Sequence, residues 1–239
     1  MQRIQGDELR KLHSPASNCS FVFLSLIMLN GFVKFLAEAL DGELPGVKAH
    51  RKLISPGREL SYPADDAPEI KHSGVLFLLF PDKDRLFTCL IKRPSSMKHH
   101  PGQIGFPGGK VEKNDSSSQM AAMREAEEEV GLTSGSYRII GKLSDLYIQV
   151  SNFIIHPYVA WVDRKPVFTL NNSEVEDIIL FPIQDFMENE HFAETEIMTF
   201  TGLVKVPYYP FNGEIIWGAT AMILSEYFEI IKHYQSTPE

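Results

Sequence analysis

Short hydrophobic runs recur along this chain, separated by polar stretches that contain proline, glycine or asparagine. Runs rich in β-branched and aromatic residues predict β-strands. The first two, 73–80 and 86–93, flank the turn sequence Pro-Asp-Lys-Asp and therefore predict a β-hairpin. Further strands are predicted at 137–142, 146–150, 154–162, 175–181 and 203–208.

Other segments repeat hydrophobic residues three and four positions apart, which is the helical period. They predict helices at 24–40, 183–187 and 217–231, and a further helix that begins at the serines 116–118 and ends at Gly131. The first helix has one apolar face and so does the last: Phe32, Phe35, Leu36 and Leu40, and Ala221, Leu224, Phe228 and Ile231. This mixture of strands and helices predicts an α/β (α+β) fold.

The N-terminal region differs from the rest of the chain. Residues 21–29 form an apolar run that is too short to span a bilayer, and the acidic Asp7 and Glu8 before it disfavour a signal peptide. We therefore predict an N-terminal extension and helix over residues 1–40, followed by one domain over residues 41–239.

The stretch from Gly108 to Leu132 carries the clearest chemical signal. Glu125, Glu128 and Glu129 are spaced i, i+3 and i+4, so their carboxylates share one helical face. Like charges at this spacing destabilise a helix, and a bound divalent cation would offset that repulsion. Because carboxylate oxygens suit Mg²⁺ or Mn²⁺, the pattern predicts a site for one of these ions.

This stretch resembles the Nudix box, Gly-x5-Glu-x7-Arg-Glu-U-x-Glu-Glu-x-Gly-U, in which U is an aliphatic residue. The first half departs from it: Asp115 replaces the Glu that follows Gly109, and eight residues rather than seven separate Asp115 from Arg124. The second half matches at every fixed position: Arg124, Glu125, Ala126, Glu128, Glu129, Gly131 and Leu132.

The residues upstream are similar to the extra motif of coenzyme A pyrophosphatases. The matching residues are Leu90-Ile91-Lys92-Arg93-Pro94-Ser95, Lys98, Gly102 and Phe106-Pro107-Gly108-Gly109-Lys110, with Pro94 standing where that motif has Ser. Members of this subfamily often share the Asp and the extra spacing of the box. The resemblance covers about residues 74–227. It implies a Nudix fold, in which a mixed β-sheet is sandwiched between α-helices, and hydrolysis of the diphosphate of coenzyme A or acyl-CoA derivatives to adenosine 3′,5′-bisphosphate and 4′-phosphopantetheine or its acyl form.

The predicted metal site follows from the charges and from this resemblance. Glu125 and Glu129 lie one helical turn apart and are the expected principal ligands, while Glu128 would bind a second ion or act on the attacking water. By resemblance, a backbone carbonyl of the Gly108 turn completes the site. Arg124 is expected to orient the glutamates through charge-assisted hydrogen bonds.

The general base remains open at this point. Glu128 is the choice inside the box, and Glu174 or Glu176 are choices outside it, since Nudix enzymes differ in this residue. Arginine suits bidentate phosphate contacts and lysine acts as a point charge. The predicted substrate-binding residues are Arg93, Lys98, Gly109 and Lys110.

Charge narrows the choice of partner. The net charge of −8 disfavours nucleic acid and anionic membranes as partners. The segment 92–113 nevertheless holds five cations and one acid, which suits a polyanionic, nucleotide-type small molecule such as coenzyme A. With two cysteines the chain has no disulfide framework, which favours a cytoplasmic location. A homodimer is compatible with these features.

Two other functions are compatible with the motifs. One is a Nudix diphosphatase for another nucleoside diphosphate compound, such as ADP-ribose or a dinucleotide, which would not require a 3′-phosphate on its substrate. The other is a non-catalytic Nudix-fold binding module, which would bind a ligand without a Mg²⁺-dependent product.

Overall fold

The computed structural model describes residues 26–58, 60, 69–83, 85–97, 101–188, 191–199 and 202–236. The predicted substrate residue Lys98 lies outside these ranges, as does most of the predicted N-terminal extension. The helices are α1 (Leu26–Asp41), α2 (Val47–His50), α3 (Ser118–Val130), α4 (Ile183–Glu188) and α5 (Gly218–Ser236), with a 3₁₀ turn, η1, at Arg51–Leu53. The strands are β1 (Lys71–Asp82), β2 (Arg85–Lys92), β3 (Ile104–Gly105), β4 (Gly108–Lys110), β5 (Arg138–Lys142), β6 (Leu146–Ile148), β7 (Phe153–Trp161), β8 (Asp177–Pro182), β9 (Ala193–Thr199), β10 (Gly202–Phe211) and β11 (Glu214–Trp217).

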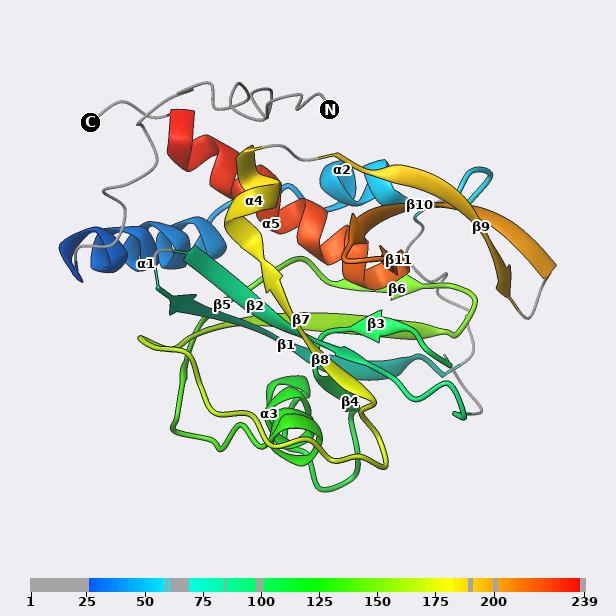
Figure 1. Cartoon of the computed structure of the whole chain (residues 1–239), viewed down its shortest axis with the longest axis horizontal. Coiled ribbons are helices and arrows are strands. Elements are labelled where there is room, and N and C mark those ends of the chain that lie inside the picture. The colour runs from blue at the N-terminus through cyan, green and yellow to red at the C-terminus, as the bar shows by residue number, and fades with distance from the viewer. Residues whose placement is uncertain are drawn as a thin grey trace, which may run out of the picture.

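A mixed eight-stranded sheet forms the centre of the molecule. Its main path runs β3-β2-β1-β7-β5, while β4 pairs with β1, β6 with β7 and β8 with β2. The predicted hairpin of β1 and β2 is antiparallel, whereas β1 and β7 run parallel. Helix α3 covers one face of this sheet, and α1 and α5 lie over the other face (Figure 1). The predicted mixed sheet between helices is therefore confirmed.

Strand β1 shows why both faces are covered. Its residues 76–80 are all fully buried. Phe77 and Leu79 face the core beneath α1 and α5, while Leu76, Leu78 and Phe80 face the smaller core beneath α3. Because neighbouring side chains of a strand point to opposite faces, a continuous apolar run fits a strand buried on both sides.

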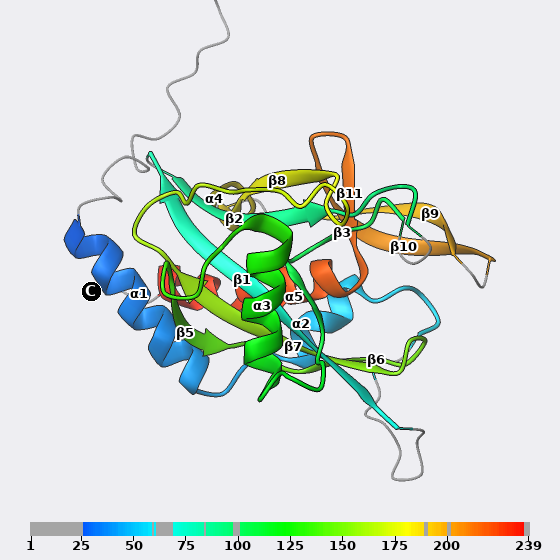
Figure 2. The same ribbon diagram turned by 90° about the horizontal axis from the view of Figure 1, so that it is seen from below.

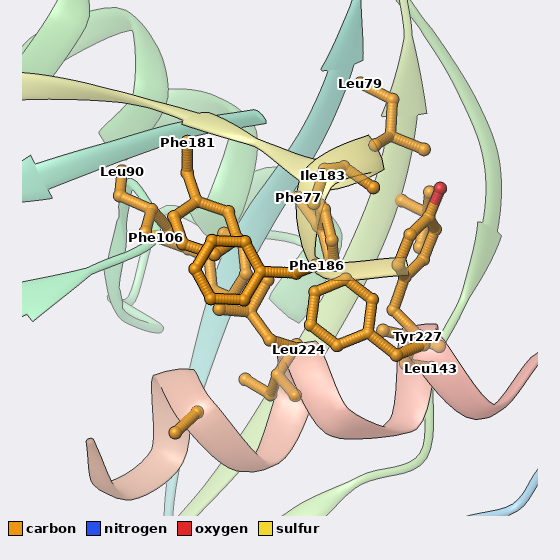
Figure 3. Packing of buried hydrophobic residues seen from close by; sticks show 14 of the residues in the cluster. Phe77, Leu79, Leu90, Phe106, Leu143, Phe181, Ile183, Phe186, Leu224 and Tyr227 are labelled. Atoms are coloured by element: carbon orange, nitrogen blue, oxygen red, sulfur yellow. The ribbon is translucent and has the colours of Figure 1, made fainter. Parts of the chain in front are cut away.

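Helix α5 contributes more buried residues to the larger core than any other described element. Figure 3 shows Phe106, Phe181 and Phe186 gathered above this helix. The rings of Phe181 and Phe186 lie 4.5 Å apart between centroids, and those of Phe77 and Tyr227 lie 4.8 Å apart. All four residues predicted on the apolar face of this helix, Ala221, Leu224, Phe228 and Ile231, are buried, as predicted.

A second sheet of three strands was not predicted as such. Its order is β11-β10-β9, and the pattern had predicted only the middle strand. Strand β9 was missed because it alternates exposed polar residues with half-buried ones and has few apolar residues. Trp217 was assigned to the closing helix but ends β11, so α5 begins one residue later than predicted.

Helix α1 packs against the domain through its predicted face. Leu36 and Leu40 are buried in the larger core, and Phe32 and Phe35 are partly buried against it. Leu40 lies directly over Gly141 of β5, where a Cβ atom would come within 2.5 Å of the Leu40 Cβ. In the ranges that the structure describes, no helix has the length and apolar character needed to cross a membrane.

Candidate active site

Helix α3 has the boundaries that the sequence predicted. The hydroxyl of Ser117 accepts a hydrogen bond from the Met120 backbone N–H at 3.2 Å and so caps the helix. Gly131 ends it in the left-handed conformation with φ 73°. At Gly74 of β1 a Cβ would collide with the Ser118 carbonyl oxygen. Glycine there lets the helix approach the sheet closely.

Three carboxylates meet beside this helix. One oxygen each from Glu125, Glu129 and Glu174 lies within 4.8 Å of the other two. Glu174 comes from the loop before β8, and the Asn171 side-chain amide donates to its Oε1 at 3.2 Å. The Asn171 backbone N–H donates to the Glu129 carbonyl oxygen at 3.0 Å, which ties this loop to the last turn of α3.

Glu129 is the most buried member of the cluster, with 1% of its surface exposed. Its Oε2 accepts the Gly108 backbone N–H at 2.9 Å, and its Oε1 lies 3.7 Å from Arg93 Nη1. Burial raises the pKa of Glu129 to about 8, and the Glu125 charge adds to this effect. The ionised form therefore needs a nearby cation, so a hard divalent ion fits the donor set of this cluster.

Gly109 leaves room for the Glu125 carboxylate where β4 passes α3. A Cβ on Gly109 would collide with the Glu125 carboxylate. The close approach leaves Glu125 largely removed from water, and this burial raises its pKa even though Arg124 lowers it. Gly108 and Gly109, predicted to form a turn, instead begin strand β4, and they position two of the three carboxylates, one through an N–H group and one through the absence of a side chain.

Arg124 binds several acceptors at once. Its Nε and Nη2 donate to the two oxygens of Asp115 at 3.1 and 3.0 Å, and Nη1 donates to both Glu125 and Glu128 at 2.9 Å. Nη2 also donates to the Lys110 carbonyl oxygen at 3.2 Å. These bonds hold the pKa of Asp115 below its usual value and raise that of Arg124. Asp115 had been noted only as a departure from the box, and here it anchors the arginine.

The structure does not bring all predicted acids together. Glu128 is half exposed and bonds to Arg124, so it lies outside the cluster, whereas Glu174 lies inside it. Glu176 points elsewhere: its Oε2 accepts the backbone N–H and the hydroxyl of Ser95 at 3.1 and 3.4 Å. No local pattern predicts this division, because Glu174 and Glu176 are separated from α3 by three strands.

Arg93 lies beside the cluster, with its Nη1 3.7 Å from Glu129 Oε1. It directly follows β2, and Arg93 Nε is buried without a hydrogen-bond partner among the described residues. A buried donor that is left unbonded is costly and is normally satisfied by water or a ligand. Lys110 is exposed at the end of β4, and Lys98 falls outside the described residues.

A comparison with known protein families identifies the family of this chain. The NUDIX domain model matches residues 70–199, more than half of the 239 residues. The chain belongs to the NUDIX domain family. The recognition of a Nudix hydrolase from its box is thereby confirmed.

Several curated Nudix proteins are similar to this chain. "Peroxisomal coenzyme A diphosphatase ndx-8" of Caenorhabditis elegans is 37% identical over 51% of this chain and 53% of its own length. "Nudix hydrolase 22, chloroplastic" of Arabidopsis thaliana is 31% identical over 70% of this chain and 57% of its own length. "Uncharacterized Nudix hydrolase NudL" of Yersinia enterocolitica is 30% identical over 64% of this chain and 77% of its own length. The chain thus spans little more than half of the first two relatives.

Among solved structures, that of a MutT/nudix family protein from Enterococcus faecalis is 13% identical. It covers 87% of this chain and 75% of its own, with a TM-score of 0.48.

Proposed function

We propose that this protein is a metal-dependent diphosphatase that cleaves coenzyme A or its acyl derivatives into adenosine 3′,5′-bisphosphate and 4′-phosphopantetheine or its acyl form. Nudix hydrolases act on phosphorus-containing anhydrides. The observation that carries the proposal is the cluster of Glu125, Glu129 and Glu174, with the unbonded Nε of Arg93 beside it.

The three carboxylates of the cluster would hold Mg²⁺ or Mn²⁺. When bound, such an ion neutralises phosphate oxygens and lowers the pKa of water. The residues of the chain provide the positioning. The Gly108 N–H orients Glu129, and Arg124 holds Glu125 and Glu128 in fixed directions. The carbonyl of Gly108 stays a predicted ligand.

Two residues remain as proposed general bases. Glu128 is exposed next to the cluster, and Glu174 belongs to the cluster itself. A pH–rate profile of the two single Gln variants separates them, since the variant that loses the low-pH limb lacks the base. The contacts of Glu176 with Ser95 favour instead a role in holding the loop that follows Arg93.

Three observations support coenzyme A as the substrate. The segment 92–113 is basic within an acidic chain, and Arg93 brings a guanidinium group to within 3.7 Å of a cluster carboxylate. The relative with 37% identity is named as a coenzyme A diphosphatase. Lys98, Gly109 and Lys110 complete the proposed substrate contacts, while the cytoplasmic location and the homodimer stay predictions.

The test is product analysis by chromatography after incubation of the protein with Mg²⁺ and, separately, coenzyme A, dephospho-coenzyme A and ADP-ribose. Preferential cleavage of coenzyme A to the two named products supports the proposal. Preference for ADP-ribose would instead favour a diphosphatase of different specificity. Tight binding without any product would favour a binding module.

A further inference from the structure

A cavity lies at the N-terminal end of α3, away from the carboxylate cluster. It measures about 570 Å³ and is bounded by the start of β1, the middle of β7, the loop after β4 and the first turn of α3. Figure 2 shows β1 and β7 passing behind α3, and Figure 1 shows the helix lying on that face of the sheet. The residues that matter here are Lys71, His72, Lys110, Lys113, Ser118 and His156.

The walls of this cavity are basic although the protein as a whole is acidic. Lys71, Lys110 and Lys113 form no ion pair with any residue in the described ranges. Of the two acids in the adjoining loop, Asp115 binds Arg124 and Glu112 is exposed. Glu69 contributes the one carboxylate among the described residues that line the cavity. Lys71 Nζ lies over the Phe153 ring at 5.6 Å, a contact that leaves its charge in place. The excess of ammonium groups over carboxylates creates a local positive potential that attracts anions.

Two histidines form a hydrogen-bonded chain at the same wall. His72 Nδ1 lies 2.9 Å from His156 Nε2, and the rings stack at 5.2 Å between centroids. His156 Nδ1 lies 2.7 Å from Asp145 Oδ1, and Lys142 Nζ contacts that same oxygen at 2.6 Å. Burial opposes ionisation of Asp145, but bonds from His156 and Lys142 outweigh it and hold its pKa below the usual value.

The hydrogen bonds from Asp145 through His156 to His72 fix which ring nitrogens donate and which accept. An ionised Asp145 accepts a hydrogen bond, so the proton on His156 is at Nδ1 and its Nε2 accepts from His72 Nδ1. His72 Nε2 is then the remaining ring nitrogen. The His72 ring lies at the same wall as the three ammonium groups.

We propose that this cavity is a binding site for a phosphate monoester dianion, distinct from the carboxylate cluster. The donors are the ammonium groups of Lys71, Lys110 and Lys113, and the His72 ring lies at the same wall. Ser118, which opens α3, brings the positive end of the helix dipole to the same wall. Along α3, Ser118 and Glu125 are about 10 Å apart at 1.5 Å per residue, so the two sites share one helix.

The dianion has two sources. One is a phosphate on the substrate that lies away from the scissile diphosphate, and this source rests on the proposed function. The other is a free phosphate compound that acts as an effector. The binding test below requires neither substrate nor turnover, so its failure is distinguishable from failure of the proposed diphosphatase activity.

The binding test is a titration of the full chain with inorganic phosphate, in chelator and at constant ionic strength, followed by NMR of the histidine ring nitrogens. We expect saturable shifts of the His72 and His156 signals. His50 serves as an internal control, because it is buried against Glu226 and should not respond. Absence of a saturable shift at His72 and His156, or equal shifts at all three histidines, overturns the proposal.

Matched variants add a second measurement. Lys113→Ala should weaken phosphate binding about tenfold, the loss of one charge-assisted contact. Lys48→Ala removes an equally exposed lysine from α2 and should leave the affinity unchanged. If the two substitutions weakened phosphate binding equally, the affinity would depend only on the net charge of the protein, and the proposal would also be overturned.

Steady-state kinetics then distinguish the two sources. For a substrate phosphate, Lys113→Ala raises KM for coenzyme A about tenfold and leaves KM for dephospho-coenzyme A unchanged. For a free effector, Lys113→Ala leaves both KM values unchanged but abolishes the effect of added phosphate on the rate. Both results require phosphate binding at the cavity, and neither arises if the titration shows none.

Discussion

Glu129 carries a carboxylate that the fold removes almost wholly from water, and its pKa rises to about 8 as a result. Replacement by Gln keeps the shape and removes the charge. We expect Glu129→Gln to reduce kcat by more than the roughly 10- to 100-fold typical of residues that support a metal ligand. We also expect Mg²⁺ to raise the melting temperature of the wild-type protein but not that of the variant, because only the ligand set binds the ion. Thermal unfolding with and without Mg²⁺ measures this.

The control is Glu128→Gln, which removes an exposed carboxylate of the same helix that lies outside the cluster and shares the Arg124 guanidinium with Glu125. This variant should retain the stabilisation by Mg²⁺. If Glu129→Gln were stabilised by Mg²⁺ as strongly as the wild type, the assignment of Glu129 as a ligand would be wrong.

The buried carboxylate also predicts a pH dependence of the metal-free protein. The folded state holds a proton on Glu129 up to about pH 8, whereas the ordinary pKa of the group is 4.5. The folded state therefore binds more protons in this window, and the free energy of unfolding should fall as pH rises through it. Urea unfolding in chelator at both ends of the window tests this. Glu129→Gln should have a smaller slope than the wild type, and identical slopes would contradict the prediction.

Asp115 acts on the site through Arg124. Asp115→Asn removes the charge that accepts both arms of the Arg124 fork. We expect Arg124 to hold Glu125 less firmly, and kcat at saturating Mg²⁺ to fall about 10- to 100-fold with little change in fold. Asp163→Asn is a suitable control, since Asp163 is an exposed carboxylate that lies 3.9 Å from Arg138. Unchanged kcat in Asp115→Asn would show that Arg124 needs no such anchor.

At the scale of elements, α5 is joined to the N-terminal part of the domain by a buried carboxylate. Glu226 is fully buried and accepts hydrogen bonds from His50, the Gly46 N–H and the Ser144 N–H. Glu226→Gln should lower the free energy of unfolding by about 3 kcal/mol, because it breaks a buried charged network. Glu229→Gln, three residues further along α5, removes a carboxylate that is partly exposed to water and pairs with Lys52. It should cost less than about 1 kcal/mol. Urea unfolding of both variants gives the comparison.

The same contact predicts loss of stability in acid. Burial would raise the pKa of Glu226, but its hydrogen bonds from His50 and the backbone lower it below 4.5 overall. A pKa that is lower in the folded state than in the unfolded state stabilises the fold at pH values above the unfolded-state pKa. This stabilisation is lost as the pH falls through the folded-state pKa. The gap in stability between wild type and Glu226→Gln should therefore narrow below about pH 4.5. A gap that stays constant with pH would mean that the charge of Glu226 contributes nothing.

At the scale of the whole molecule, the question is whether α1 belongs to the domain. Leu36 is fully buried in the larger core, and Leu40 lies over Gly141. Leu36→Ala should lower the free energy of unfolding of the entire domain by about 2–5 kcal/mol, in one cooperative transition. Fluorescence-monitored urea unfolding measures it. An early transition of α1 alone would support the predicted boundary after residue 40, whereas one shared transition would place α1 within the domain.

Much of the fold follows from local patterns. The hairpin of β1 and β2 and the limits of α3 are encoded by short-range signals, namely an apolar run on each side of a turn, a serine cap and a final glycine. Strand β9 was not predicted because only one of its faces is partly covered, so its sequence has little apolar periodicity. Strand β11 was not predicted because it has only four residues and continues directly into α5, so that its last residue, Trp217, was assigned to the helix.

The sequence by itself determined the class of the protein and the helix that carries Glu125 and Glu129, because a motif and a helical period depend only on neighbours along the chain. Only the tertiary structure decided that Glu174 completes the cluster while Glu128 stays outside it. The fold likewise decided the burial of Glu129 and the hydrogen bonds that run from Asp145 through His156 to His72. Burial and electrostatic coupling depend on residues that are distant in sequence and adjacent in space, and these long-range contacts leave no local pattern to read.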